Sequence, residues 1–371
     1  MMKRIFIANP VFNGNEKKYL NECIDTGWVS ANGRFIEEFE NKFAEFCGTK
    51  YAVSCANGTV SLHLIMLGLG LKPGDEVIMP SLTYIATANT VKYCGATPIF
   101  VDSIEGTFNM DPSDIEERIT SCTKAIIPVH LYGLPCDMKP IMDIANRYDI
   151  PVIEDAAEAH GAEYEGRRVG GFGLASSFSF FGNKIITCGE GGMVTTNNEE
   201  LYKRMKLLKA QAVSPKKKYW HVDVGYNYRM TNMQAAVGLG QLEKIQWHIT
   251  QRKRIADLYK EFLRDYKEYV HLQEEPDNCK HVYWMSNVIL QDSVKKSRDD
   301  VMKEMEEYNI EMRPLFYPMH IMPPFFDENI VCPIAEKISA RGISLPSHAM
   351  LTAQDVKYIS ECLIKIVTAK N

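Results

Sequence analysis

Short apolar runs alternate with helix-like segments through the first three fifths of the chain, and this order restricts the fold more than any other feature. Strand-like runs occupy residues 51–55, 76–79, 98–101, 124–130, 152–154, 176–181 and 193–196, and helical patterns occupy 59–69, 86–93 and 138–148. Strands that alternate with helices are typical of an α/β fold with a mostly parallel sheet. Ligands of such sheets bind beyond the carboxyl ends of the strands, so a site is expected there.

The pattern changes after about residue 245. A long charged helical segment spans residues 246–266, and mixed strand-like and helical stretches follow at 281–290, 298–308 and 352–367. We therefore predict a large α/β domain at residues 1–245 and a smaller C-terminal α+β domain at residues 246–371, hinged near the long helix.

Composition and charge exclude several classes of protein. Of the 371 residues, 46% are hydrophobic and 24% are charged, which is the balance of a globular protein and not of a disordered chain. The net charge is -5 and no basic tract stands out, which argues against a nucleic-acid partner. No apolar run approaches the roughly 18 residues of a membrane span, and the first apolar stretch is too short for a signal peptide. No membrane partner and a cytoplasmic location are therefore expected.

The sequence also lacks the motifs of several common enzyme classes. G-x-G-x-x-G, the Gly-Lys dipeptide, H-E-x-x-H and G-x-S-x-G are all missing. Their absence argues against nicotinamide dehydrogenases, P-loop hydrolases, zinc proteases and standard α/β-hydrolases. The ten cysteines form no C-x-x-C pair, and no metal site is predicted.

A glycine-containing turn joins the strand-like run 51–55 to the helical segment after it. Within Ala56-Asn57-Gly58-Thr59, Gly58 allows backbone N–H groups to approach a phosphate at the helix N-terminus, and Thr59 adds a hydroxyl donor. The same residues also suit an N-cap turn that binds no ligand.

An acidic residue ends the next informative run. In the segment 152–158, apolar residues lead into Asp155, which is expected at the carboxyl end of a strand. A carboxylate buried there needs a cationic partner, and a protonated pyridine nitrogen is one such group. The alternative is an ordinary acidic loop residue or helix cap.

A lone lysine closes the apolar run 176–181. Lys184 follows Ser177-Phe178-Ser179-Phe180-Phe181-Gly182-Asn183, and a glycine-rich turn comes after it. Lysine forms Schiff bases, and burial favours its nucleophilic free amine. The alternative is a lysine whose stem covers the end of a strand while its amine stays in water.

Together the three segments fit pyridoxal 5'-phosphate (PLP). The glycine turn would cradle the phosphate, Asp155 would keep the ring nitrogen protonated, and Lys184 would react with the aldehyde. Ser179, five residues before Lys184, could also reach the phosphate.

The chain resembles the DegT/StrS group of sugar aminotransferases, which have the fold-type I PLP-dependent architecture. The resemblance covers nearly the whole length. The segments that carry it are TGWVSANGRFIEEFE, NGTVSLHL, PSLTYIATAN, PVHLYG, IEDAAEAHG, SFSFFGNKIITCGEGGM, GYNYRMTNMQAA and RPLFYPMHIMPP. It implies an aspartate aminotransferase-like fold, with a large mostly parallel α/β/α domain and a smaller C-terminal domain.

The resemblance also implies roles for matching residues. Lys184 would hold PLP as a Schiff base, and Asp155 would pair with the ring nitrogen. Gly58, Thr59 and Ser179 would bind the phosphate.

Three further positions take roles only from the resemblance. Tyr84 would stack on the ring, and Glu158 would lie near the ring hydroxyl, where the wider group commonly has Gln. Asn227 would reach the phosphate of the neighbouring subunit's PLP, so that a homodimer shares its active sites.

The implied reaction moves an amino group from L-glutamate to carbon 4 of GDP-4-keto-6-deoxy-D-mannose, with pyridoxamine 5'-phosphate as the intermediate cofactor form. Arg313, Met319 and His320 lie close together in a Pro-rich loop and are expected near the nucleotide-sugar. A surface arginine and a packed histidine are the alternative there. Other functions to weigh are amination of a UDP- or dTDP-linked ketosugar, a non-catalytic PLP-binding regulator and a nicotinamide dehydrogenase.

Overall fold

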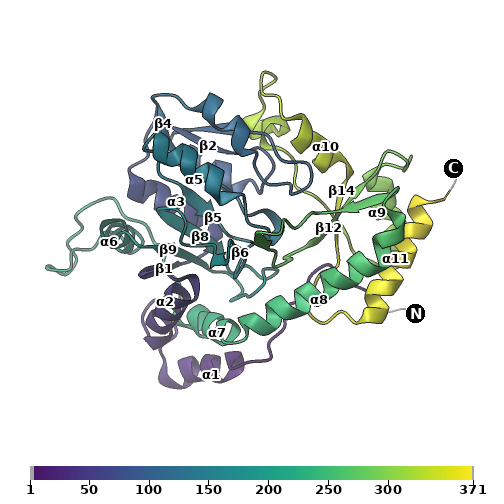
Figure 1. Cartoon of the computed structure of the whole chain (residues 1–371). Helices are drawn as coiled ribbons and strands as arrows, with labels where there is room; N and C mark the ends of the chain where they lie inside the picture. The colour runs from purple at the N-terminus through teal and green to yellow at the C-terminus, as the bar shows by residue number, and fades with distance from the viewer. Residues whose placement is uncertain (1–3, 370–371) are drawn as a thin grey trace.

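The computed structural model describes residues 4–369, and a seven-stranded sheet forms the centre of its larger part (Figure 1). The order across the sheet is β3 (Thr97–Val101), β2 (Glu76–Pro80), β4 (Thr123–Ile126), β5 (Ile153–Asp155), β8 (Ala175–Ser179), β9 (Gly192–Thr196) and β1 (Tyr51–Cys55). Parallel bridges at Ile126–Val152 and Val129–Asp155 join β4 to β5. Of these seven strands, β9 runs antiparallel to its neighbours and the others are parallel. The predicted mostly parallel sheet is confirmed.

Helices cover both faces of this sheet. They are α2 (Arg34–Cys47), α3 (Gly58–Leu69), α4 (Ala86–Tyr93), α5 (Met138–Arg147), α6 (Glu199–Leu208) and α7 (Asn232–Leu242), and α1 (Glu16–Thr26) packs against α7. Successive residues of β8 show the two layers, because side chains alternate across a strand. The Ser177 hydroxyl bonds that of Ser61 on α3, whereas the Phe178 ring packs 4.9 Å from the ring of Phe43 on α2. The predicted α/β/α arrangement is therefore present.

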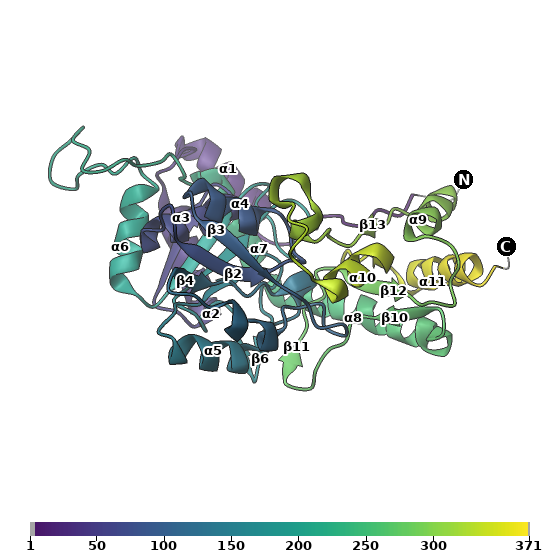
Figure 2. The same cartoon turned by 90° about the horizontal axis from the view of Figure 1, so that it is seen from above.

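The C-terminal part has its own sheet and core. Strands β10 (Val270–Leu272), β12 (Ser286–Leu290), β14 (Gly342–Leu345) and β13 (Arg313–Pro314) pair antiparallel in that order. Helices α8 (Ile245–Leu263), α9 (Arg298–Glu307) and α11 (Ala353–Val367) surround it, and Figure 2 shows this part beside the larger sheet. A further helix, α10 (Pro333–Arg341), packs Ile338 into the larger core. A small sheet, β11-β6-β7, is formed by Cys279–Lys280, Glu163–Tyr164 and Arg167–Arg168.

Helix α8 runs from one core to the other. Ile245, at its start, belongs to the larger core, and Ile255 and Tyr259, further along, belong to the smaller one. Leu315 and Phe325 return to the larger core from beyond the predicted boundary at residue 245. The division into 1–245 and 246–371 thus stays a prediction. Among residues 4–369 no helix has the length and apolarity needed to span a bilayer.

Candidate active site

A cavity of about 450 Å³ opens at the carboxyl ends of the parallel strands. Segments from both parts of the chain line it. The larger part contributes Asn57, Gly58, Thr59, Leu62, Thr83, Tyr84, Ala86, Thr87, Val129, Tyr132, Asp155, Ala157, Glu158, Ser179, Phe181, Asn183, Lys184 and Glu190, and the smaller part contributes Trp284, Met285, Arg313, Pro314, Phe316 and Ser344. The structure therefore brings the three segments singled out in the sequence into one cavity.

One wall of the cavity is the N-terminus of α3. Asn57 caps the helix, its side chain accepting the Val60 N–H at 3.0 Å. A Cβ added to Gly58 would lie 2.7 Å from the Ser179 Cβ, so a larger residue would not fit without displacing β8. The close approach brings the Ser179 hydroxyl beside the positive end of the helix, an arrangement suited to a phosphate.

Glu154 and Asp155, at the end of β5, face opposite sides of the strand. Glu154 points away from the cavity, where it accepts the Gly170 N–H at 2.9 Å and lies 3.2 Å from His130 Nε2. Asp155 lines the cavity; its Oδ2 accepts the Thr87 hydroxyl at 2.8 Å and its Oδ1 accepts the Ala157 N–H at 3.2 Å. Burial raises the pKa of Asp155, because the ionised carboxylate has lost contact with water. A cation beside Asp155 would stabilise the ionised form.

Lys184 and Glu158 face each other inside the cavity. Lys184 Nζ is 3.4 Å from Glu158 Oε1 and 4.0 Å from the centroid of the Trp284 ring. Both side chains are largely buried, at 12% and 5% exposure. Glu158 Oε2 also accepts the backbone N–H of Tyr132 at 2.8 Å. Burial raises the pKa of Glu158, while the nearby Lys184 opposes that shift.

A stack of aromatic rings forms the opposite wall. The Tyr132 ring lies 6.1 Å from that of Trp284 and 5.2 Å from that of Phe316, with interplanar angles of 10° and 18°. Tyr132 adopts a left-handed backbone (φ 58°), and its hydroxyl accepts the Phe316 N–H at 2.9 Å. These three residues were not predicted as site residues, although Tyr132 and Phe316 fall in the segments PVHLYG and RPLFYPMHIMPP. Trp284 lies outside the segments that carry the resemblance, in the stretch 281–290 that was predicted only as strand-like.

The mouth of the cavity is more open. Tyr84 is 57% exposed, with its ring 5.7 Å from that of Phe316. The Arg313 side chain is 45% exposed, and its nearest carboxylate, on Glu311, is 3.6 Å away. Both therefore have room to contact a ligand.

The structure does not bring Met319 or His320 into the cavity. Both are buried, and His320 is fixed at both ring nitrogens: Nδ1 is 2.7 Å from the Ser81 hydroxyl and Nε2 is 3.1 Å from Glu336 Oε1. The alternative of a packed histidine fits the contacts of His320, and a substrate role for these two residues stays a prediction. Sequence proximity to Arg313 does not place them in the cavity, since the chain turns inward at Pro318.

Asn227 also lies outside this cavity. It is exposed on the segment between α6 and α7, where its Oδ1 accepts two bonds from the Arg229 guanidinium at 3.0 and 3.1 Å. Its predicted partner is a second subunit, so its place here leaves that prediction untested.

PLP fits the donor set of the cavity. The close Gly58–Ser179 approach at a helix N-terminus suits a phosphate, and buried Asp155 suits a protonated ring nitrogen. The Lys184 amine lines the same cavity, between Glu158 and the Trp284 ring. Among residues 4–369 no cluster of side chains is arranged to hold a metal ion.

Known proteins are similar to this chain over nearly their whole lengths. The GDP-perosamine synthase of Caulobacter vibrioides is 49% identical over 367 residues, covering 99% of each chain, and that of Escherichia coli O157:H7 is 47% identical over 369 residues, covering 100% of each. The solved structure of DesV from S. venezuelae is 32% identical, with a TM-score of 0.90 over 96% of this chain and 95% of that one. A sugar aminotransferase from Streptococcus pneumoniae, solved in PLP and PMP forms, is 26% identical, with a TM-score of 0.93 over 98% of each chain in the PMP form.

The profile of one family matches residues 11–364 of this chain. That match, the relatives and the cavity agree on the chemistry. The protein belongs to the DegT/DnrJ/EryC1/StrS aminotransferase family and is a PLP-dependent sugar aminotransferase.

Proposed function

We propose that the protein transfers the amino group of L-glutamate to carbon 4 of GDP-4-keto-6-deoxy-D-mannose, giving GDP-perosamine for O-antigen synthesis. The observation that carries this proposal is the set of three relatives named GDP-perosamine synthase, which are 44–49% identical over at least 96% of the chain. Relatives with other printed substrates are less similar; a dTDP-sugar transaminase of Aneurinibacillus thermoaerophilus is 37% identical.

Lys184 and Asp155 would perform the central steps. PLP, when bound, supplies an electron sink that makes the hydrogen on the donor's α-carbon acidic. Lys184 would hold the cofactor covalently at rest; its amine, once released, would take the α-proton of glutamate and deliver a proton to the cofactor's reactive carbon. In the half-reaction with the ketosugar, Lys184 would return a proton in the opposite direction. Asp155 would keep the ring nitrogen protonated, and the Thr87 hydroxyl and Ala157 N–H orient it for that task.

The remaining lining residues would bind and orient. Gly58, Thr59 and Ser179 would hold the cofactor phosphate, and Tyr84 would stack on the ring. Arg313 at the mouth would donate to the diphosphate of the nucleotide-sugar, because its guanidinium fork is half exposed and only loosely held by Glu311.

We also propose that the protein works as a homodimer in which Asn227 completes the neighbour's site. The segment that carries Asn227 exposes Tyr219, Trp220, Val222 and Val224, and Tyr219 is 83% exposed. An exposed apolar set of this kind marks a surface for association. Sedimentation equilibrium of the active enzyme should give a dimer or a multiple of one, and a fully active monomer would refute the shared site.

A visible absorption scan during sequential additions tests the reaction itself. L-Glutamate alone should remove the visible band of the lysine-bound cofactor, and GDP-4-keto-6-deoxy-D-mannose should restore it. Restoration by a UDP- or dTDP-linked ketosugar and not by the GDP-sugar would keep the aminotransferase and overturn the substrate. A band that glutamate leaves unchanged would overturn the proposed donor.

A further inference from the structure

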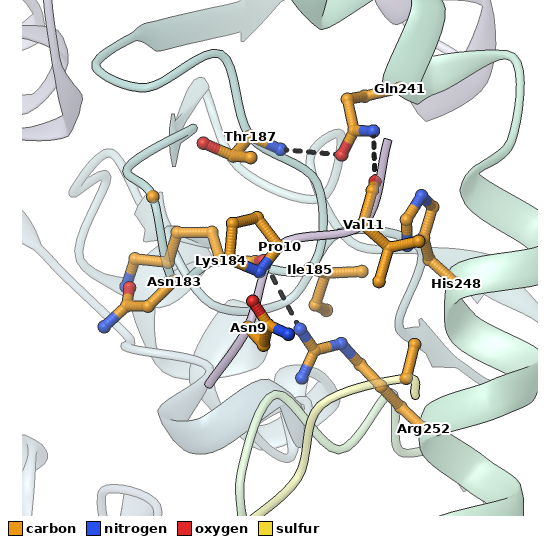
Figure 3. Close-up of a pocket in the computed structure, with 12 residues that line it drawn as sticks. Asn9, Pro10, Val11, Asn183, Lys184, Ile185, Thr187, Gln241, His248 and Arg252 are labelled. Carbon is orange, nitrogen blue, oxygen red and sulfur yellow. Dashed lines mark hydrogen bonds between the residues drawn. The ribbon is translucent and has the colours of Figure 1, made fainter. Parts of the chain in front are cut away.

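The backbone of Lys184 is contacted, on the side away from the cavity, by a side chain that does not line the cavity. Arg252, on α8, directs its guanidinium toward the backbone of Lys184, as Figure 3 shows. Its Nη2 lies 3.4 Å from the Lys184 carbonyl oxygen, and its Nη1 donates to the carbonyl oxygens of Trp284 at 2.9 Å and Ser347 at 3.0 Å. One cation thus joins three separate segments of backbone.

Trp284 completes the arrangement from the other side. Its indole Nε1–H donates to the Asn183 carbonyl oxygen at 2.8 Å. The carbonyl groups of Asn183 and Lys184 belong to the two peptide planes on either side of the Lys184 Cα. The Lys184 N–H donates to the Phe181 carbonyl at 2.9 Å. Because both planes are held, the backbone dihedrals of Lys184, and with them the direction of its Cα–Cβ bond, are held too.

Burying the charged Arg252 side chain at this position costs free energy of folding. It is 6% exposed, and within residues 4–369 no carboxylate pairs with it, so backbone oxygens are its acceptors. Burial lowers the pKa of Arg252 to about 10, which still leaves it charged at neutral pH. A buried cation without an anionic partner destabilises a fold, so its presence at this position calls for a further role.

The space around this contact is small and separate from the cofactor cavity. A void of about 10 Å³ behind Lys184 is lined by Asn9, His248 and Arg252, among others, and has room for about one water molecule. Gln241 spans it, accepting the Thr187 N–H at 3.3 Å and donating to the Val11 carbonyl at 2.8 Å (Figure 3). The segment 183–187 is therefore bound to α7 through Gln241 and to α8 through Arg252.

We propose that Arg252, together with Trp284, is a positioning residue for transamination: the pair fixes the two peptide groups that flank Lys184, so that its amine stays aligned between the cofactor and the substrate carbon. This inference rests on the proposed role of Lys184. It adds that the alignment is set in part by Arg252 on helix α8, which does not line the cavity.

The test compares Arg252→Lys with a matched control on the same helix. Arg252→Lys keeps the charge but loses the fork that reaches three carbonyl groups. Arg254→Gln is the control, because Arg254 also donates to a backbone carbonyl, that of Leu351 at 2.7 Å, without contacting Lys184. Trp284→Phe is the second variant. It removes the Nε1–H donor to Asn183 but also shrinks the ring beside Lys184 Nζ, so its result is read together with that of Arg252→Lys, which leaves the cavity lining unchanged.

Three readouts separate positioning from a merely structural effect. Single-turnover loss of the visible band with L-glutamate should slow about 10²-fold in Arg252→Lys, the effect of a small misalignment of reacting groups. The KM for glutamate should change by less than about threefold. The visible circular dichroism of the bound cofactor, measured without any donor, should change in Arg252→Lys and in Trp284→Phe but not in Arg254→Gln.

The circular dichroism readout does not depend on the donor, so it distinguishes failure of this inference from failure of the proposed function. Folded Arg252→Lys and Trp284→Phe variants with unchanged dichroism and unchanged single-turnover rates would overturn the positioning role. A lowered melting temperature with those two readouts unchanged would overturn it as well, and would make Arg252 a structural link of the hinge. A wild-type band that glutamate does not remove would refute the proposed donor instead.

Discussion

The inner end of the cavity and its mouth are built in different ways. At the inner end, Asp155 and Glu158 are buried and hydrogen-bonded to Thr87, Ala157 and Tyr132. At the mouth, the Arg313 side chain is half exposed, and its nearest carboxylate among residues 4–369, on Glu311, lies 3.6 Å away.

This difference separates two requirements. The two carboxylates that are proposed to act on the cofactor are oriented before anything binds, which is what electrostatic stabilisation of a reaction needs. Arg313, which is proposed to meet the sugar nucleotide, is left free to adjust. Variants at the inner end should therefore change the chemistry, and variants at the mouth should change specificity.

The largest expected effect is at Lys184. Lys184→Ala should abolish transamination, because no other amine lines the cavity among the described residues to hold the cofactor and carry the proton. The variant should still bind PLP, without the absorption of the lysine-bound form. Lys184→Arg is the matched control: it keeps a cation beside Glu158 but forms no Schiff base, and it should be equally inactive. Turnover by either variant would remove the basis of the mechanism.

Asp155 tests the inner end without removing the covalent link. Asp155→Asn keeps the shape and an acceptor oxygen but loses the negative charge, and its half-reaction with glutamate should slow by about 10²–10³-fold. Thr87→Val removes only the hydroxyl that orients Asp155 and should cost about tenfold or less. Equal losses in the two variants would mean that orientation, and not charge, is what Asp155 supplies.

Arg313 tests the mouth. Arg313→Gln should lower kcat/KM for the GDP-ketosugar about 10–100-fold, the effect of losing charged hydrogen bonds worth about 1.5–3 kcal/mol. The rate of the glutamate half-reaction at saturating glutamate should stay near that of wild type. Glu311→Gln, which removes only the carboxylate beside Arg313, is the control and should change kcat/KM little. A loss confined to the glutamate half-reaction would contradict the assignment to the nucleotide diphosphate.

The inner end of the cavity could be predicted from the sequence better than its mouth. Strands with continuous apolar residues and the motifs at their carboxyl ends placed Gly58, Asp155, Ser179 and Lys184 in one cavity, because parallel strands end at a common edge. Helix α2 was missed, although Phe35, Phe39 and Phe43 recur at helical spacing. The strand expected at 124–130 ends at Ile126, and the chain then continues into the cavity wall.

Contacts between segments that are far apart in the sequence could not be predicted from local residue patterns. Trp284 stacks on Tyr132 across 152 positions of sequence, and Arg252 reaches Lys184 across 68, which no periodicity signals. His320 shows the converse, since its closeness to Arg313 in sequence did not place it in the cavity. Which face of a Pro-rich loop points inward depends on packing that the loop's own residues do not determine.

The smallest expected effect concerns Glu158 and stability. Burial raises its pKa above the ordinary 4.5, so the folded state binds this proton more tightly than the unfolded state. Stability is therefore lost as pH rises from 4.5 through the raised pKa, and above that window the buried carboxylate destabilises the fold. Glu158→Gln lacks this penalty and keeps an acceptor for the Tyr132 N–H. Its cofactor-free form should melt about 2 °C above wild type at neutral pH, with the difference vanishing below pH 4.5. Glu190→Gln, at the exposed mouth, should show no such difference. A Glu158→Gln variant that melts below wild type at neutral pH would mean that attraction to Lys184 outweighs burial.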